Sequence, residues 1–397
     1  MAKFLSKNNK RLIFLFLGVF VAGFSFFVPG LGIYFSRHIV GLHRQGYFQI
    51  INDLKSFLFF LGIAIVFFGF ILSLERVWSK FKNIIINTTL VFCSIVVTLA
   101  LIEIALYCTY KNISVGGALS PSFYTIYKDY KHNRNGYRDN KNYYYKKRHQ
   151  GIHRTLVLGD SLSYGSGVKD VNKTYPKLLE GALNTYISKG KFEVLNFSRS
   201  GRSTEEELNL FKTIGKRYDP DTVILGYYLN DAETEEVSEE INTSKKTLEL
   251  LPEPYEEFIT GHSYTYYIFK YMLKALFLNE QNKYFIHSLY RTDRISKHID
   301  TLEELILLVQ EKSSMIIVIF PVITDFNNYP YKYIHKIIKE VATRNNVNVI
   351  DLLPSFKAEG YRTLRVSRFD SHPNEKAHLL AAKQIFWSLY KDRASFK

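Results

Sequence analysis

Two kinds of hydrophobic pattern divide the chain near residue 110. Before that point the apolar residues form three long runs, 12–35, 56–74 and 84–107, of 24, 19 and 24 residues. At a rise of about 1.5 Å per residue, each run as a helix crosses a hydrocarbon core of roughly 30 Å. Glu103 is the only acidic residue within the runs. The pattern therefore predicts three transmembrane helices rather than the buried core helices of a soluble domain.

The first run has a second interpretation, a cleaved signal peptide. Its apolar stretch of 24 residues is longer than a signal-peptide core of about 7 to 15 residues. We therefore expect a retained helix.

After residue 150 short apolar runs alternate with helical stretches, which is typical of a parallel sheet with crossover helices. The predicted strands are 155–158, 193–197, 222–227, 315–320 and 347–352. The predicted helices are 175–188, 204–217, 302–310, 331–344 and 373–390. The sequence thus predicts an α/β domain at 151–397 after a membrane region at 1–110, and the chemistry of such a domain is expected at the carboxyl ends of its strands.

Two segments do not follow either pattern. Residues 111–150 are polar, rich in Tyr, Lys and Asn, and predict a juxtamembrane connector. Its cluster Lys146-Lys147-Arg148 is either a solvated face or a site of attraction to anionic headgroups. An insertion at 232–300 combines an acidic run with the aromatic stretch 264–269. It is interpreted either as a lid or substrate wall, or as a solvated loop followed by an ordinary packing helix.

The net charge is positive but unevenly distributed. The chain has 52 Lys and Arg against 37 Asp and Glu, a net charge of +15. Residues 151–397 hold 33 basic and 32 acidic side chains, so the domain lacks the basic excess of nucleic-acid-binding proteins. Nucleic acid is therefore not expected as a partner.

The basic residues flank the apolar runs and predict a topology. Lys3, Lys7, Lys10 and Arg11 precede the first run, and Arg76, Lys80 and Lys82 lie between the second and third. Under the positive-inside rule these two segments are cytoplasmic, although Arg37, Arg44 and Lys55 in the first loop weaken the bias. Three spans then place the domain after residue 110 outside the cytoplasm, in a multi-pass membrane protein.

The cysteines add little chemistry. The only two, Cys93 and Cys108, lie at the third run and its end. Neither a disulfide scaffold nor a multi-cysteine zinc site is available.

The first predicted strand ends in Gly159-Asp160-Ser161-Leu162-Ser163. A serine at a tight turn from strand to helix exposes its hydroxyl and directs its backbone N–H to the same point. Such a serine suits a nucleophile that also supplies half of an oxyanion hole. The alternative is an ordinary helix N-cap.

Three other strand-end or helix-start positions carry suitable groups. Gly201, after the second strand, allows a close backbone approach, and Asn230, after the third, has an amide that can donate to an oxyanion. Before the last helix, His372 suits a general base and Asp370 its orienting acid. Pro373 is expected in the first turn of that helix, whose positive end would favour neutral imidazole. Each position alone also fits a turn, a cap or a surface pair.

Together these residues resemble the SGNH hydrolase family, also called GDSL esterases. Gly159-Asp160-Ser161 is similar to the nucleophile block, Gly201 to the oxyanion glycine, Asn230-Asp231 to the asparagine block, and Asp370 with His372 to the acid/base block. Residues 133–138 and 155–167 resemble membrane-linked bacterial members. The resemblance covers about 130–390. It implies a three-layer flavodoxin-like parallel sheet, a Ser/His/Asp mechanism with no metal and no cofactor, and ester or acyl-transfer chemistry.

Two positions depart from the family pattern. Tyr228 stands two residues before Asn230, where the family usually has glycine, and would narrow the site. Phe369 occupies the position three before His372 at which the family's acid often stands, whereas Asp370 is two before. The role of Asp370 as the orienting acid is therefore open at this stage.

The sequence predicts a membrane-anchored, extracytoplasmic serine esterase. Its expected substrates are O-acyl, including O-acetyl, esters of envelope carbohydrate or lipid, and its expected partners are these substrates and the bilayer. One alternative is an O-acyltransferase that uses the same residues. Another is a non-catalytic envelope assembly protein that kept the fold.

Overall fold

The computed structural model describes residues 7–25, 44–72, 75–110, 130–145, 151–187, 191–234, 250–252, 255–368 and 370–394. The chain divides into two compact units. The helical unit comprises described residues within Met1–Lys111 and Leu248–Lys270. The sheet unit comprises those within Thr125–Thr247 and Tyr271–Lys397.

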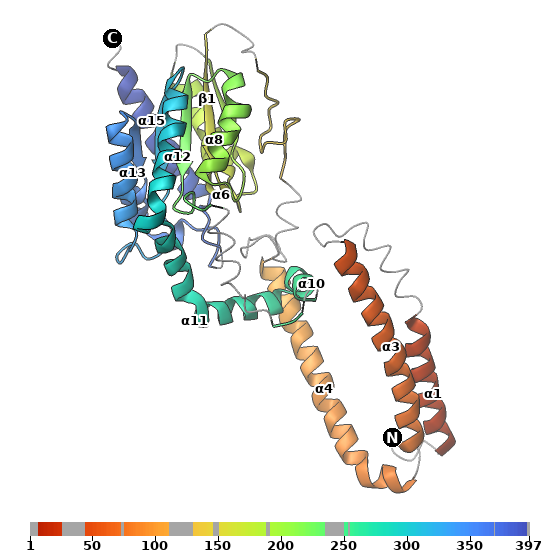
Figure 1. The fold of residues 1–397 in the computed structure, drawn as a ribbon. Helices are drawn as coiled ribbons and strands as arrows, with labels where there is room; N and C mark the ends of the chain where they lie inside the picture. Colours follow the sequence, from red (N-terminus) through yellow and green to blue (C-terminus); the bar gives the residue numbers. More distant parts are fainter. Residues whose placement is uncertain are drawn as a thin grey trace. The chain divides into compact units, whose positions relative to one another are not determined.

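The sheet unit is built on five parallel strands in the order β2-β1-β3-β4-β5 (Figure 1). The strands are β1 Ile152–Gly159, β2 Lys191–Asn196, β3 Thr222–Tyr227, β4 Ser314–Ile319 and β5 Asn348–Asp351. Most of their residues are apolar and buried, as expected of strands covered on both faces. All five predicted strands are confirmed within a few residues.

Helices cover both faces of this sheet and make a three-layer structure. They are α7 Tyr175–Tyr186, α8 Thr204–Thr213, α12 Thr292–Gln310, α13 Lys332–Arg344 and α15 Glu375–Ala394. Helix α7 packs against α15, and α8 packs against α12. The chain steps from β1 to β2 in one direction and through β3, β4 and β5 in the other, so right-handed crossovers put α7 and α8 on opposite faces. This is the flavodoxin-like fold that the sequence predicted.

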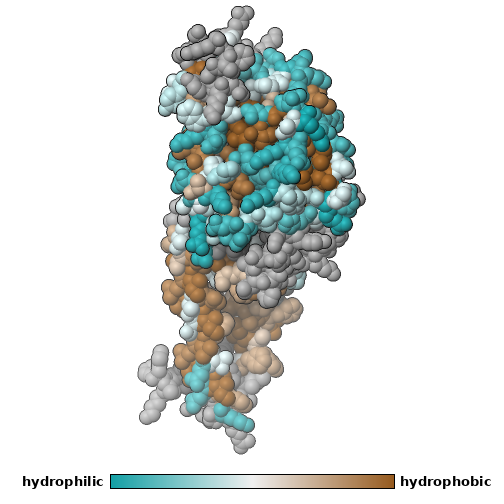
Figure 2. All heavy atoms as spheres, turned by 90° about the vertical axis from the view of Figure 1, so that its left-hand side faces the viewer, coloured by the Kyte–Doolittle hydropathy of each residue, from teal (hydrophilic) through white to brown (hydrophobic). Residues whose placement is uncertain are grey.

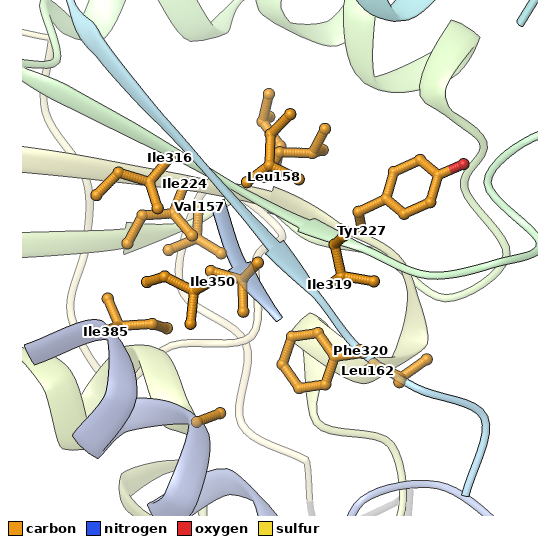
Figure 3. Close-up of a cluster of buried hydrophobic side chains, with 14 of the residues drawn as sticks. Val157, Leu158, Leu162, Ile224, Tyr227, Ile316, Ile319, Phe320, Ile350 and Ile385 are labelled. Atoms are coloured by element: carbon orange, nitrogen blue, oxygen red, sulfur yellow. The ribbon is translucent and has the colours of Figure 1, made fainter. Parts of the chain in front are cut away.

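The core lies between the sheet and these helices. Figure 3 shows the side chains of Val157, Ile224, Ile316 and Ile350, from four different strands, gathered beside Ile385 of α15. Each of these side chains is at most 8% exposed. Packing of these side chains holds the strands in place against the helices, and this positions the loops at the carboxyl ends of the strands.

Several helix boundaries differ from the sequence prediction. Helix α12 begins ten residues earlier than expected, at Thr292. The helix predicted at 204–217 ends at Thr213, and Gly215–Tyr218 forms a 3-10 turn. Helix α14, Leu353–Glu359, was not predicted. The first turns of α12 are polar and α14 is short, so neither shows a clear helical period in the sequence.

Part of the predicted connector is packed into the sheet unit. Arg138 and Asp139 are 1% exposed and Tyr143 is 5% exposed. The Tyr143 hydroxyl donates to Asp139 and accepts from the backbone N–H of Asn196 in β2 at 2.8 Å. The polar composition of this segment gave no sign of burial. Burial is possible because the buried polar groups form hydrogen bonds with one another. The basic cluster at 146–148 lies outside the described residues.

The helical unit contains α1 Lys7–Phe24, α3 Arg44–Leu72, α4 Glu75–Tyr110, α10 Tyr255–His262 and the first turns of α11, Tyr264–Leu289. By length and composition two stretches are able to span a membrane, Ile51–Phe70 in α3 and Asn83–Tyr110 in α4. The apolar part of α1, Leu15–Phe24, is shorter, and most of the remainder of the first predicted span lies outside the described residues. The predicted spans at 56–74 and 84–107 are therefore matched by suitable helices, and the predicted span at 12–35 is not confirmed.

The helices of this unit expose their apolar side chains. Phe92 is 65% exposed and Leu101 is 61% exposed. Figure 2 shows the contrast, with largely brown surfaces over the long apolar helices and a largely teal surface over the sheet unit.

Helices α1 and α3 approach each other closely at two glycines. A Cβ atom on Gly62 would lie 2.6 Å from the carbonyl oxygen of Gly18 and 2.6 Å from the Cβ of Ala22. Such contacts between backbones require small residues, and they are typical of helix pairs in membranes.

Candidate active site

The turn after β1 is built around a glycine with no room for a side chain. Gly159 has a φ of +152°, and a Cβ atom there would lie 2.4 Å from the Oγ of Ser163. Asp160 follows and caps the short helix α6, Ser161–Tyr164, by accepting from the N–H of Leu162 at 2.8 Å. This turn places Ser161 at the start of α6, half-buried at the carboxyl edge of the sheet.

A chain of hydrogen bonds links Ser161, His372 and Asp370. The Oγ of Ser161 lies 3.0 Å from Nε2 of His372, and Nδ1 of His372 lies 2.6 Å from Oδ1 of Asp370. The backbone N–H of His372 also donates to Oδ1 of Asp370 at 3.0 Å. The two-residue spacing therefore brings the carboxylate to the imidazole ring, and the sequence-predicted serine, histidine and acid meet in one site.

The loop that carries the histidine is held by its own backbone. The N–H of Val366 donates to the carbonyl of His372 at 2.9 Å, and the N–H of Ser367 donates to the carbonyl of Asp370 at 3.1 Å. Asp370 is 4% exposed, so its carboxylate is shielded from water. A carboxylate fixed in this way can hold the imidazole in one tautomer.

The environment of His372 differs from the expectation. Pro373 was expected in the first turn of the last helix, but α15 begins at Glu375, and Asn374 caps it by accepting from the N–H groups of Lys376 and Ala377. Burial tends to lower the pKa of His372, but the hydrogen bond and charge of Asp370, with the charge of Asp160, raise it above its ordinary 6.5. The neighbouring carboxylates therefore favour imidazolium, in the direction opposite to the preference for neutral imidazole that was expected from the helix start.

Asp160 has a second contact with the nucleophile. Its Oδ2 accepts from the Oγ of Ser161 at 3.3 Å, a long contact beside the shorter one to His372. Burial raises the pKa of Asp160 to about 6, although the N–H of Leu162 and the charge of His372 act in the opposite direction. The sequence identified this residue only as part of the motif.

The predicted oxyanion donors lie on the neighbouring loops. Gly201 follows β2 with a φ of +79°, and Asn230 follows β3. The N–H of Arg199 donates to the carbonyl of Gly159 at 3.1 Å, which ties the loop after β2 to the nucleophile turn. Because β2, β1 and β3 are adjacent, all three loops lie at the same edge of the sheet. The part that Gly201 and Asn230 take in stabilising an oxyanion stays a prediction.

A group of buried carboxyls lies behind the site. Glu207 on α8 is 0% exposed and Asp231 is 1% exposed, and in the described part of the chain neither oxygen of Glu207 has a hydrogen-bond partner. Burial raises the pKa of both groups well above their ordinary values, and the charge of Asp160 adds to the effect.

The helical period of α8 indicates that Glu207 lies on its inner face, although the sequence analysis did not identify this residue. Glu206 completes the capping box of α8 with Ser203, so Glu206 lies outside at the helix start. The buried residues Thr204, Glu207, Leu208 and Phe211 then follow the helical period of the inner face.

Arg138 supports the loop after the nucleophile helix. Its guanidinium donates to the carbonyls of Tyr164 at 3.0 Å and of Lys169 at 3.3 Å, and also to those of Gly165 and Val168. The guanidinium carbon lies 3.5 Å from the ring centre of Tyr130. The predicted connector thus contributes a cation that stabilises the backbone next to Ser161.

The described residues contain no group of three or more His, Cys, Asp or Glu side chains arranged to hold a metal ion.

Comparison with protein families finds one matching model. Residues 157–380 match the GDSL-like Lipase/Acylhydrolase family, a range that includes all five sequence-predicted site residues. No curated protein matches the chain.

Solved structures give weaker similarities. TesA is 14% identical, with 60% of this chain and 98% of TesA covered and a TM-score of 0.38. A two-domain esterase active on acetylated mannans is 16% identical, with coverage of 60% and 49% and a TM-score of 0.38. Axe2, an acetylxylan esterase from Geobacillus stearothermophilus, is 15% identical, with coverage of 59% and 93% and a TM-score of 0.40.

Proposed function

The chain belongs to the GDSL-like lipase/acylhydrolase family and is an SGNH-type serine hydrolase of esters, and on this premise we propose a membrane-anchored esterase that removes O-acyl groups from envelope carbohydrate or lipid. The observation that carries the proposal is the hydrogen-bonded chain of Ser161, His372 and Asp370. The family match and these hydrogen bonds together favour an enzyme over a non-catalytic assembly protein.

We assign the reaction steps as follows. The Oγ of Ser161 attacks the ester carbonyl while Nε2 of His372 takes its proton, and Asp370 stabilises the imidazolium that forms. The tetrahedral intermediate then expels the alcohol, which receives the proton from His372. Water, deprotonated by the same imidazole, attacks the acyl-serine and releases the acid and the free hydroxyl of Ser161.

We assign the oxyanion to three donors. These are the backbone N–H groups of Ser161 and Gly201 and the side-chain amide of Asn230. Removal of one such donor typically costs about 3 to 4 kcal/mol of transition-state stabilisation.

A short acyl group, such as acetyl, is the substrate we favour. Tyr228 is half-buried and its N–H donates to Asp231 at 2.9 Å, which fixes this residue in the loop that also carries Asn230. A tyrosine at this position occupies space beside the oxyanion donors that glycine would leave open. The narrower site favours acetyl over long acyl chains.

Membrane anchoring with an extracytoplasmic sheet unit is supported by three observations. The apolar faces of α3 and α4 are exposed, α1 and α3 pack through Gly18 and Gly62, and basic residues flank the apolar runs. The topology itself depends on three spans, which is the number the sequence predicts.

The test of function compares acyl chain lengths on the full chain in detergent or nanodiscs. We expect 4-nitrophenyl acetate to be hydrolysed with a higher kcat/KM than the butyrate and octanoate esters, and O-acetylated oligosaccharide to release acetate. A preference for octanoate would contradict the acetyl assignment. Acetyl transfer to an added sugar in place of release into water would identify the acyltransferase alternative.

The test of topology is protease accessibility in spheroplasts. External protease should cleave the sheet unit and spare the N-terminus. Protection of the sheet unit with digestion of the N-terminus would reverse the proposed orientation.

A further inference from the structure

Glu103 lies inside the longer of the two candidate spans yet binds a segment from far along the chain. It belongs to the stretch Asn83–Tyr110 of α4. Its carboxylate accepts from the Oγ of Ser263 at 2.9 Å, the N–H of Tyr264 at 2.8 Å and the N–H of Thr265 at 3.0 Å. These groups form the N-terminus of α11, where unpaired N–H groups and the helix dipole favour a negative charge.

A second contact joins the same segment to α3. The hydroxyl of Tyr255, the first residue of α10, donates to the carboxylate of Asp53. Asp53 lies two residues inside the other candidate span, Ile51–Phe70. Both contacts therefore involve acidic groups on the helices that are expected to lie in the bilayer.

The two acidic groups mark the same end of the helix pair. Helix α3 ends at Leu72 and α4 begins at Glu75, so the start of α3 and the end of α4 face the same side of a bilayer that both helices cross. Glu103 is seven residues before Tyr110, or about 10 Å along the helix axis. The bound segment is thus held at the depth where the hydrocarbon core meets the headgroups.

The segment Tyr255–Lys270, named here the interface segment, has the composition of that layer. It holds six aromatic residues, Tyr255, Phe258, Tyr264, Tyr266, Tyr267 and Phe269. The ring of Tyr264 lies 6.2 Å from that of Tyr107 near the end of α4. Phe269 is 53% exposed. Aromatic residues with an apolar ring and a polar edge are enriched at membrane interfaces.

The carboxylate of Glu256 is paired within the interface segment. The carboxylate of Glu256 accepts from the hydroxyl of Tyr266 and from the ammonium of Lys270. Glu103 and Asp53 likewise have donors from this segment, which lowers the cost of placing carboxylates near hydrocarbon. The interface segment therefore exposes the apolar side chain of Phe269, while the carboxylates of Glu256, Glu103 and Asp53 all accept hydrogen bonds.

We propose that the interface segment lies in the headgroup layer and binds the lipid surface, held there by Glu103 and Asp53. This proposal rests on the membrane anchoring proposed above. It assigns a lipid-contact surface to part of the insertion at 232–300. From the sequence, this insertion had two interpretations, a lid or substrate wall and a solvated loop followed by a packing helix. The partner is the boundary of headgroups and acyl chains on the side of the membrane that carries the carboxyl end of α4.

Spin labels on single cysteines test the depth of the segment. The full chain with Cys93→Ala and Cys108→Ala is reconstituted in phosphatidylcholine/phosphatidylglycerol nanodiscs. Labels are placed at Phe269→Cys, at Val96→Cys in the middle of α4, and at Tyr186→Cys, which is 73% exposed on the sheet unit. Collision with oxygen reports hydrocarbon, and collision with a water-soluble nickel chelate reports water.

We expect the label at residue 269 to favour oxygen over the chelate severalfold more than the label at 186, and less than the label at 96. A label at 269 that behaves like the one at 186, while that at 96 reports hydrocarbon, would overturn the proposal and leave the membrane anchoring intact. Water-like behaviour at 96 would instead overturn the anchoring. Fluorophosphonate labelling of the same samples reports the esterase site separately.

The hydrogen bonds are tested by Glu103→Ala against Ile104→Ala. Ile104 is the next residue of α4 and is 59% exposed. We expect Glu103→Ala to raise the chelate accessibility and mobility of the label at 269, and Ile104→Ala to leave both unchanged. An unchanged label in Glu103→Ala would show that these hydrogen bonds do not hold the segment, and would overturn that part of the proposal.

Discussion

The two units use the same apolar residue types in opposite ways. In the sheet unit Leu156, Val157 and Ile317 are 0% exposed, because strands and helices enclose them. In the helical unit Phe92 is 65% exposed and Leu90 is 63% exposed on α4. Burial of the first group from water stabilises the fold, whereas the second group would be solvated by lipid in the membrane anchoring proposed above.

Glycine also has a different task in each unit. Gly226 on β3 leaves room for the side chain of Ser163 beneath the nucleophile turn, so it serves packing between side chains. Gly18 and Gly62 allow two helix backbones to touch. The proposed membrane anchoring accounts for the difference, since lipid gives no hydrophobic force to join helices and close van der Waals packing must replace it.

The largest expected effect tests whether catalysis belongs to the sheet unit. Ser161→Ala removes the nucleophile, and loss of a triad serine lowers turnover by about 10⁶-fold in a comparable mechanism. We expect no fluorophosphonate labelling and no measurable ester turnover. The matched control is Ser200→Ala, a serine on the loop after β2 whose hydroxyl pairs with that of Ser166, and it should keep its label. Undiminished labelling of Ser161→Ala would remove Ser161 from the site.

The next effect concerns the acid that the sequence left open. Asp370→Asn removes the charge that faces Nδ1 of His372, and loss of this partner costs up to about 10⁴-fold in turnover, or roughly 5 kcal/mol. The measurement is turnover of 4-nitrophenyl acetate beside His372→Ala. A rate within about threefold of wild type, equal to about 0.7 kcal/mol, would indicate a working Ser/His dyad without Asp370.

Packing in the sheet unit is tested by two glycines with different surroundings. An added Cβ at Gly226 would lie 2.0 Å from the Oγ of Ser163, so Gly226→Ala should destabilise the unit by about 1 to 3 kcal/mol. At Gly181, in helix α7, no atom lies within 4 Å of an added Cβ. Gly181→Ala should therefore be neutral or stabilise by up to about 1 kcal/mol. Heat-induced loss of fluorophosphonate labelling measures both, and equal stability of the two variants would contradict the packing argument.

The corresponding test in the helical unit uses two glycines of α1. At Gly18 a Cβ would lie 2.5 Å from a methyl group of Val66, whereas at Gly23 nothing lies within 4 Å. We expect Gly18→Leu to separate α1 from α3 and Gly23→Leu to leave them packed. Spin labels at Leu15→Cys and Phe67→Cys, in the cysteine-free background, report the distance. An unchanged distance in Gly18→Leu would show that the close approach does not hold the pair.

The smallest effect is a shift in pH dependence. The base must be neutral to accept the proton of Ser161, and Asp370 raises the pKa of His372 above 6.5. Activity should therefore fall as the pH drops through a value above 6.5, and in Asp370→Asn this limb should move to lower pH. The same shift adds folding stability that is present below the unfolded pKa and is lost as pH rises through the folded one. Identical acid limbs of kcat/KM in the two proteins would contradict the assignment of Asp370.

The sequence alone determined the class of the sheet unit and the two residues at the centre of its site. Alternation of short apolar runs with helices is a local pattern, and it predicted all five strands in a parallel sheet. Ser161 and His372 stand at a strand end and before a helix, positions that are also defined locally. The apolar runs likewise identified α3 and α4 by length and composition.

Only the tertiary structure decided which groups meet. Ser161 and His372 are 211 residues apart in sequence, and no local pattern shows that Asp370 reaches the ring across a two-residue spacing. Composition predicted a polar connector, whereas Arg138 is buried among backbone carbonyls. The sequence marked Glu103 only as the one acid of the apolar runs, and packing brings it to the N-terminus of α11. The physical reason is that periodicity records which side of an element avoids water, while hydrogen bonds between distant groups depend on how the elements pack.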